Sequence, residues 1–207
     1  MNELLVIHPM NPQPRQVSRA VEVIRNGGVV IYPTDSCYAL GCYVGDKAAM
    51  ERIHRIRQTD RTHNFTLVLR DLSAIGEYAR VDNWAYRLLR AHTPGPFTFI
   101  LRATGSVPRR LQNPRRKTIG IRVPDHPITQ ALLAELAEPI MSSTLILPDE
   151  SLPMTDPVEI HEKLAHTVDL VIDGGQCGIE PTTVIEMYQG EARLVRQGRG
   201  HSSVFET

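Results

Sequence analysis

Residues 27–41, Gly27-Gly28-Val29-Val30-Ile31-Tyr32-Pro33-Thr34-Asp35-Ser36-Cys37-Tyr38-Ala39-Leu40-Gly41, carry the strongest fold signal in this chain. The glycine pair ends a helix, as glycines at helix C-termini commonly do. Val29 to Tyr32 then reads as a buried strand, and the Pro-Thr-Asp-Ser segment as a turn at its carboxyl end. Ligands of open α/β sheets bind at that edge. The stretch therefore predicts a strand and a site together.

Strands and helices alternate on either side of this stretch. The spacing of Val17, Ala20, Val21 and Ile24 predicts a helix over 15–26, and Asp46 is placed to cap another. Further helices are expected over 83–91, 128–137 and 157–164. Strands are expected over 4–7, 29–32, 65–69, 98–101, 118–123, 140–144, 169–172 and 183–185. This order predicts an α/β fold: one domain, residues 1–207, with a twisted mixed sheet flanked by helices.

Composition indicates an ordinary globular chain, with 42% hydrophobic and 22% charged residues. No apolar run approaches the roughly 18 residues that a membrane span needs. The start, Met1 to Leu4, lacks the basic region of a signal peptide. Three cysteines without a paired spacing suit a reducing compartment. We therefore expect a cytoplasmic protein without a membrane partner, as a monomer or a dimer.

The charge is unevenly distributed along the chain. Residues 1–124 hold 19 Lys and Arg but 9 Asp and Glu, whereas residues 125–207 hold 4 and 14. The excess is concentrated in a basic cluster, which we define as Arg109, Arg110, Arg115, Arg116 and Lys117. Such a cluster attracts the phosphates of a nucleotide or of a nucleic acid. The alternative is a solvated loop whose charges pair with the acidic half of the chain.

Several common site motifs are absent from the sequence. There is no GxGxxG, GxxxxGK[ST] or GxSxG motif. The main sequence evidence for a dinucleotide-binding Rossmann fold, a P-loop nucleotide site or a hydrolase nucleophile elbow is therefore missing. The histidines lack metal-binding spacing, and we expect no metal site. Cys37 lies in the candidate turn without an evident base, which favours a small buried thiol.

Five segments together resemble the YrdC/YciO family, and most closely its YciO branch. The resemblance covers nearly the whole chain, and residues 55–58 and 63–67 match that branch. The five segments are residues 33–41, 93–98, 118–127, 142–144 and 181–185. The family's best-known activity is synthesis of threonylcarbamoyl-AMP from L-threonine, bicarbonate and ATP, which feeds the modification of tRNA adenosine. The resemblance thus implies an α/β fold with a concave basic pocket, and ATP with Mg²⁺ as a substrate.

The resemblance also implies roles for individual residues. The side chains expected to line the threonine side are Thr34, Arg122, Ser143 and Thr182. Those expected to face the nucleotide and its phosphates are Arg57, Thr118, Thr144 and Arg196. Arginine suits this work because its planar fork binds carboxylates and phosphates in pairs of hydrogen bonds.

Each assignment has a structural alternative. Thr34 can instead satisfy backbone groups of its own turn. Arg122 can face solvent from an alternating strand, and Tyr38 can be a core aromatic with a bonded hydroxyl. Thr182 can simply be a β-branched strand residue. The alternative for Arg196 is an exposed side chain that binds no ligand.

Two positions depart from the pattern of the synthases. Their Lys-x-Arg pair is matched by Arg57-Gln58-Thr59, and their Ser-x-Asn by Thr144-Leu145-Ile146. Each lost charge-assisted hydrogen bond costs about 1.5–3 kcal/mol, or roughly 10- to 150-fold. Arg55 or Arg61 is near enough in sequence to replace the missing cation, whereas no neighbour replaces the amide.

The departures leave the reaction open. The first expectation is an enzyme of adenylate chemistry, with weak or altered threonylcarbamoyl-AMP synthesis or hydrolysis of an acyl-adenylate. The second is a protein that binds double-stranded RNA or tRNA through the basic cluster, without synthase activity. The cluster contains no aromatic residues, so contacts to the RNA backbone are favoured over base stacking.

Overall fold

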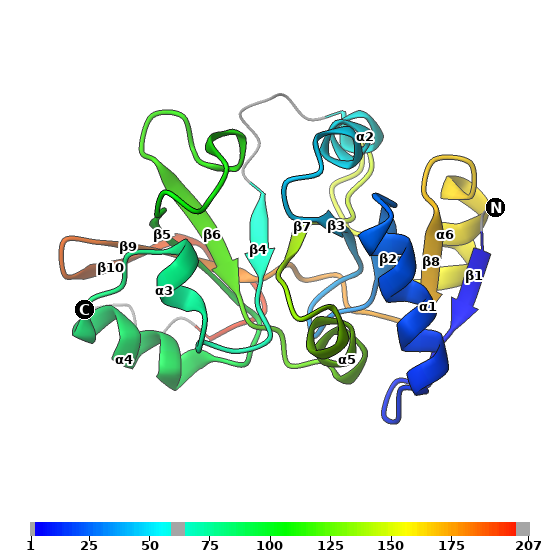
Figure 1. Cartoon of the computed structure of the whole chain (residues 1–207), viewed down its shortest axis with the longest axis horizontal. Coiled ribbons are helices and arrows are strands. Elements are labelled where there is room, and N and C mark those ends of the chain that lie inside the picture. Colours follow the sequence, from blue (N-terminus) through cyan, green and yellow to red (C-terminus); the bar gives the residue numbers. More distant parts are fainter. Residues whose placement is uncertain (1–2, 59–64, 202–207) are drawn as a thin grey trace.

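The computed structural model describes residues 3–58 and 65–201, which form one twisted ten-stranded sheet with helices on both faces (Figure 1). The strands lie in the order β1-β8-β2-β3-β7-β4-β6-β5-β9-β10. Their bounds are β1 Glu3–Val6, β2 Val30–Tyr32, β3 Ala39–Tyr43, β4 Thr66–Val68, β5 Phe97–Arg102, β6 Thr118–Arg122, β7 Ile140–Thr144, β8 Leu170–Asp173, β9 Thr183–Tyr188 and β10 Glu191–Arg196. The helices are α1 Pro14–Arg25, α2 Lys47–Arg57, α3 Ile75–Tyr78, α4 Asn83–His92, α5 Pro127–Leu136, α6 Pro157–Leu164 and the 3₁₀ turn η1 Arg109–Leu111.

The sheet is mixed. The pairs β1·β8, β2·β8, β4·β6 and β5·β9 are parallel, and the remaining five neighbours are antiparallel. The α/β class and the mixed, helix-flanked sheet expected from the sequence are therefore confirmed. In the part of the chain that the structure describes, every helix is too short or too polar to span a bilayer.

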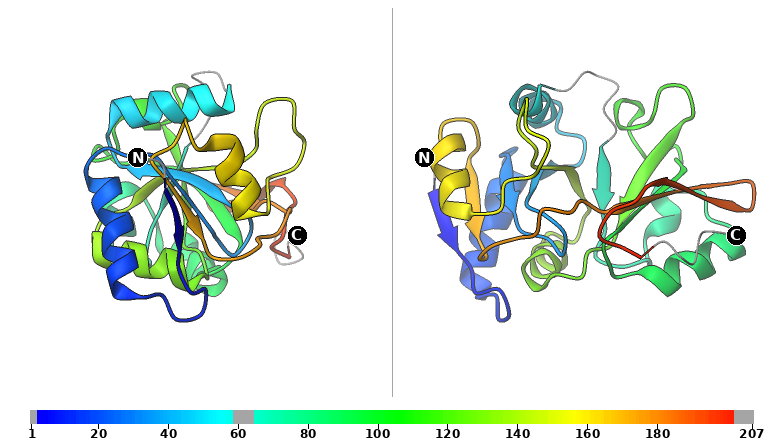
Figure 2. Two further views of the ribbon diagram at one scale, coloured as in Figure 1. Left: turned by 90° about the vertical axis from the view of Figure 1, so that its right-hand side faces the viewer. Right: turned by 180° about the vertical axis from the view of Figure 1, so that it is seen from behind.

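Side-chain alternation along the strands divides the core into two clusters. Leu67 of β4 and Ile121 of β6 face one side, against α2, α3, α4 and α6. Val68 of β4 faces the other side, against α1 and α5. Figure 2 shows these helices on either side of the twisted sheet. Among the described buried residues, none from β5, β6, β9 or β10 joins the second cluster, so α1 and α5 cover only part of that face.

Local signals explain the elements near the opening stretch. The four apolar residues expected on one face of α1 are all buried. Gly27 ends this helix with φ +79°, a conformation that favours glycine, and the Gly28 N–H donates to the carbonyl of Val23 at 2.9 Å. The side chain of Asp46 caps α2 by accepting from the Ala49 N–H at 2.9 Å. The expected cap and helix are both confirmed.

Four elements were not expected from the sequence: α3, η1, β3 and β10. Residues 39–41 belong to β3, which returns antiparallel along β2. The Pro33–Tyr38 segment therefore joins two neighbouring strands, whereas the sequence suggested only an open strand end. Its Thr34, Asp35 and Ser36 side chains contact the end of β6. β10 is an edge strand whose residues are mostly exposed, and its apolar alternation is limited to Ala192 and Leu194, which pack partly buried against the first core cluster.

Candidate functional site

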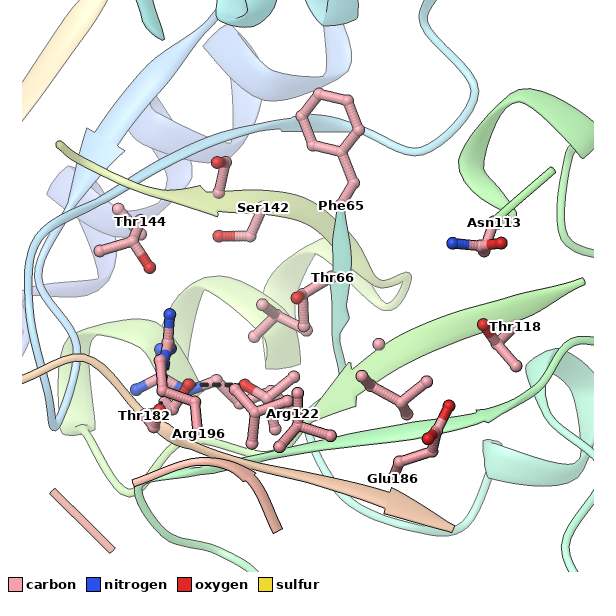
Figure 3. A pocket seen from close by; sticks show the side chains of 18 of the residues that line it. Phe65, Thr66, Asn113, Thr118, Arg122, Ser142, Thr144, Thr182, Glu186 and Arg196 are labelled. Carbon is pink, nitrogen blue, oxygen red and sulfur yellow. Dashed lines mark hydrogen bonds between the residues drawn. The ribbon is translucent and has the colours of Figure 1, made fainter. Parts of the chain in front are cut away.

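A cavity of about 630 Å³ lies on the face of the sheet that α1 and α5 cover only in part (Figure 3). Its size falls within the roughly 300–1,000 Å³ of small-molecule sites. In Figure 3, Arg122, Thr182 and Arg196 lie towards one end, and Asn113, Thr118 and Glu186 towards the other.

Strand register builds the floor of the cavity. Thr66 of β4 pairs with Gly120 of β6, and Gly120 pairs with Ile100 of β5, which in turn pairs with Glu186 of β9. Successive side chains of a strand point to opposite faces, so this row faces away from the first core cluster. A Cβ on Gly120 would lie 2.9 Å from Thr66 Oγ1 and 3.3 Å from Thr98 Cγ2. Because Gly120 has no side chain, the centre of the cavity floor stays free of side-chain atoms from β6.

The lining is strongly cationic. Five arginines contribute, namely Arg57, Arg115, Arg116, Arg122 and Arg196. Among the described lining residues the one carboxylate is Glu186, which forms an ion pair with Arg116. Clustered cations on a concave surface attract anionic ligands.

Arg57 enters the cavity from the last turn of α2. Its Nη1 donates to Ser143 Oγ at 2.5 Å, and its Nε donates to the carbonyl of Ile146 at 3.3 Å. Burial, together with the nearby charge of Arg196, lowers the pKa of Arg57 below its ordinary value. Arg57 and Arg196, which come from distant segments of the chain, thus both contribute positive charge to the lining of this cavity. A ligand phosphate between them would relieve their repulsion.

The β2–β3 connection fixes the Arg122 side chain through three hydrogen bonds. Its Nη2 donates to Thr34 Oγ1 at 3.1 Å, to Ser36 Oγ at 2.9 Å and to an Asp35 carboxylate oxygen. The side chain is 9% exposed, and its buried Nε has no acceptor within the described residues. Arg122 is thus a buried ion-paired residue, which excludes the alternative of a solvent-facing strand arginine.

Hydroxyl groups complete the end near Arg196. The hydroxyl oxygens of Thr98 and Thr182 are 2.7 Å apart, and Arg196 Nη2 donates to the Thr182 carbonyl at 2.9 Å. Ser142 accepts a hydrogen bond from the Tyr32 hydroxyl at 2.7 Å. Burial raises the pKa of Tyr32 to about 12, so that phenol stays a neutral donor.

Most of the residues selected from the sequence meet in this cavity. Those in the lining are Arg57, Arg115, Arg116, Thr118, Arg122, Ser143, Thr144, Thr182 and Arg196. Thr34 is outside the lining. It supports Arg122, donates to the Cys37 carbonyl at 2.6 Å and accepts from backbone N–H groups of its own turn. The turn role, given above as the alternative to ligand binding, is thus confirmed for Thr34, while ligand contact by any of these residues stays a prediction.

The basic cluster divides between cavity and surface. Its five members are exposed, but only Arg115 and Arg116 line the cavity. Arg110 donates to the carbonyl of Gly45, which links η1 to the loop before α2. Arg116 pairs with Glu186 of the acidic half, as the solvated-loop alternative expects for part of the cluster.

The two departures from the synthase pattern have different outcomes. Ile146 lines the cavity, so a hydrocarbon occupies the place of the amide. Thr59 and Arg61 lie outside the described residues. Arg55 is exposed on α2 and is not part of the lining.

Sequence reasoning missed Asp35, Thr66, Thr98, Gly120 and Glu186 as site components. Alternating small or polar residues on β4, β5 and β6 were an available signal, because a strand covered on both faces is usually continuously apolar. The pairing of Asp35 with Arg122 left no such signal, since it depends on tertiary contact.

Two structural alternatives are confirmed. Tyr38 is fully buried, and its hydroxyl donates to the Gly175 carbonyl at 2.6 Å. Cys37 is buried, and burial raises the pKa of its thiol. Neither contributes to the lining, and a raised pKa keeps Cys37 in its less reactive thiol form.

Within residues 3–58 and 65–201, no group of three or more His, Cys, Asp or Glu side chains is arranged to hold a metal ion. Glu186 is the one carboxylate of the described lining, and Arg116 engages it. The described part of the lining therefore offers no set of carboxylates for a resident Mg²⁺.

The fold is that of a domain of the Sua5/YciO/YrdC type. The model of that family, described as "Telomere recombination", matches residues 22–198, and the chain belongs to this family. Protein YciO of Escherichia coli is 53% identical over 205 residues, which cover 99% of this chain and 100% of that protein. Its crystal structure superposes with a TM-score of 0.95 over 99% of this chain and all of that one. The chain is a YciO-type member of the family.

More distant relatives include enzymes. A threonylcarbamoyl-AMP synthase of Nitrosococcus oceani is 30% identical over 160 residues, 77% of this chain and 85% of that protein. The fold also matches the crystal structure of P. abyssi Sua5 complexed with L-threonine, with a TM-score of 0.86 at 23% identity. That match covers 95% of this chain and 57% of that one.

Proposed function

We propose that this protein binds ATP or an adenylate together with L-threonine in the cavity described above. The observation that carries the proposal is the gathering of five arginines around a hydroxyl-lined floor, with one paired carboxylate in the described lining. A nucleotide supplies the anionic groups for such a lining, and threonine supplies a carboxylate and a hydroxyl. Synthase relatives and the L-threonine complex of Sua5 support this choice of ligands.

The two ligands would occupy neighbouring parts of the cavity. Arg57 and Arg196 both line the cavity and suit the phosphates, with Thr118 and Thr144 in the same lining. Arg122 would receive the threonine carboxylate, beside the hydroxyls of Ser143 and Thr182.

The proposed reaction is weak or altered formation of threonylcarbamoyl-AMP, linked to modification of tRNA adenosine. The chain would contribute by positioning the substrates and neutralising phosphate charge. Mg²⁺ would enter as part of the ATP substrate, since Glu186 is already paired with Arg116. Hydrolysis of an acyl-adenylate is the alternative adenylate reaction, but a described lining in which Glu186 is the one carboxylate supplies little to activate water.

The direct test is incubation of the protein with ATP, Mg²⁺, L-threonine and labelled bicarbonate. We expect binding of ATP and threonine by calorimetry, with slow release of pyrophosphate and formation of labelled adenylate. A second assay presents preformed threonylcarbamoyl-AMP and measures its consumption. Absence of binding, synthesis and consumption would refute the proposal.

RNA binding is the second candidate, because Arg109, Arg115 and Lys117 are exposed on the segment that borders the cavity. Backbone contacts by these residues predict binding that weakens steeply with salt. Titration of double-stranded RNA and tRNA at several salt concentrations tests this. Absent binding at low salt, or binding that salt does not weaken, would exclude it.

A further inference from the structure

The carboxylate of Asp35 joins two segments behind the cavity. One oxygen accepts from Arg122 Nη2 and the other accepts from the Asp125 N–H at 3.0 Å. The Arg122 and Asp35 side chains are 9% and 10% exposed. Asp35 does not line the cavity, so it acts on a ligand only through Arg122.

Arg196 provides the contrast. It also lines the cavity, yet the one hydrogen bond that its side chain makes to a described residue goes to the neutral carbonyl of Thr182. The strands place Arg122 opposite Val68 and Arg196 opposite Val184, on the same face of the sheet. The same face of the sheet therefore presents two arginines. A buried carboxylate compensates the charge of Arg122, whereas Arg196 has no such partner within the described residues.

We propose that Asp35 determines the ligand specificity of Arg122, so that Arg122 accepts the carboxylate of an amino acid and rejects phosphate. The inference rests on the function proposed above, because it assumes that both ligand classes enter this cavity. Asp35 is a positioning and specificity residue in this scheme; it touches no substrate.

The physical reason is the balance between desolvation and attraction. The cost of removing an ion from water rises with the square of its charge, whereas its attraction to a fixed ion pair rises in proportion to that charge. The neutralised Arg122–Asp35 pair can therefore offset the desolvation of a carboxylate but not of a phosphate dianion. The ammonium group of a zwitterionic amino acid also gains from the negative charge of Asp35.

The arrangement also limits how Arg122 can bind. Nη2 is committed to three acceptors on the Thr34–Ser36 segment, and Nε is buried. Nη1 is the nitrogen that no described residue occupies. A single donor suits one carboxylate oxygen better than it suits a phosphate, which arginines bind most tightly through two nitrogens.

The test begins with the unmodified protein. Calorimetric titrations of L-threonine and of ATP are repeated in the presence of inorganic phosphate. We expect phosphate to weaken apparent ATP binding and to leave the threonine Kd within about twofold. Phosphate that competes with threonine as strongly as with ATP would overturn the inference.

The second arm is Asp35→Asn, which removes the charge at nearly constant volume. Phosphate should become a competitor of threonine, and the preference for threonine over phosphate should fall by about tenfold or more. Ser36→Ala removes a neutral acceptor of the same Nη2, so affinities can change while the preference stays. An unchanged preference in Asp35→Asn would contradict the proposal.

Asp169→Asn is a matched control. The Asp169 carboxylate accepts from Arg52 Nη1 at 2.6 Å and from the Val29 N–H at 2.7 Å, so it also joins an arginine to a backbone donor, away from the cavity lining. This variant should lose stability without a change of preference. If Asp35→Asn does not fold, the competition in the unmodified protein decides alone. If that protein binds neither threonine nor ATP, the proposed function itself fails, which is a separate outcome.

Discussion

The hydroxyl oxygens of Thr98 and Thr182 lie 2.7 Å apart and join β5 to the residue that precedes β9. Both side chains are buried, at 8% and 6% exposure, although they line the cavity. The two strands pair in parallel, with Phe97 opposite Thr183. A pair of polar groups therefore ties the floor of the cavity to the strand that leads to Arg196.

Thr98→Val and Thr182→Val should each lower the free energy of unfolding by about 1–3 kcal/mol, because each leaves a buried hydroxyl without its partner. The double variant should lose less than the sum of the two, since it removes both polar groups together. Urea unfolding of the four proteins measures this coupling. Additive losses would show that the hydroxyl pair contributes nothing specific.

Gly120→Ala should weaken binding of ATP and threonine by about tenfold or more while the protein still folds. The added methyl would lie 2.9 Å from Thr66 Oγ1 and 3.3 Å from Thr98 Cγ2, so floor side chains must shift into the cavity. Calorimetry measures the affinities. Gly105→Ala is the control, because a Cβ there meets nothing within 4 Å. Equal affinities in the two variants would remove Gly120 from the binding surface.

The parts of the fold that were predictable follow local rules. The apolar stripe of α1, the Asp46 cap and the strand at Ile140–Thr144 depend on neighbouring residues in the sequence. The edge strand β10 was not predicted, because its apolar alternation is limited to Ala192 and Leu194, which are only partly buried against the first core cluster.

The candidate site was likewise predictable only in part from the sequence. The resemblance to the family selected Arg122 and Thr182, and both line the cavity. The sequence could not show that Asp35, 87 positions from Arg122, compensates its charge. It also could not place Thr34 behind Arg122, since that depends on how β3 turns back along β2.

His126 should make the protein less stable in mild acid. Burial lowers the pKa of His126; Asp35 and Asp125 oppose this shift, whereas Arg122 adds to it. The unfolded chain, with a histidine pKa near 6.5, then binds the proton more readily than the folded one. The stability that neutral His126 contributes to the folded state is therefore intact above about pH 6.5. It is lost as the pH falls towards the lower, folded-state pKa of His126.

His126→Gln should accordingly flatten the pH dependence of unfolding below about pH 6.5 and leave its slope above about pH 7.5 unchanged. Urea unfolding of both proteins from mild acid to neutral pH measures the difference. An equally steep loss of stability in the variant would assign the acid sensitivity to other groups.

Arg57→Met should weaken ATP binding by about 10- to 100-fold and change threonine binding much less. Methionine retains much of the side chain's apolar volume but removes the charge and the hydrogen bonds to Ser143 and Ile146, and a charge-assisted hydrogen bond is worth about 1.5–3 kcal/mol. Arg55→Met is the control on the same helix, because Arg55 is exposed and outside the lining. An ATP affinity that falls equally in both variants would indicate general charge attraction. A loss confined to Arg57→Met would show that Arg57 binds phosphate. It would do so although the second cation of the synthase Lys-x-Arg pair is replaced by Thr59 in this chain.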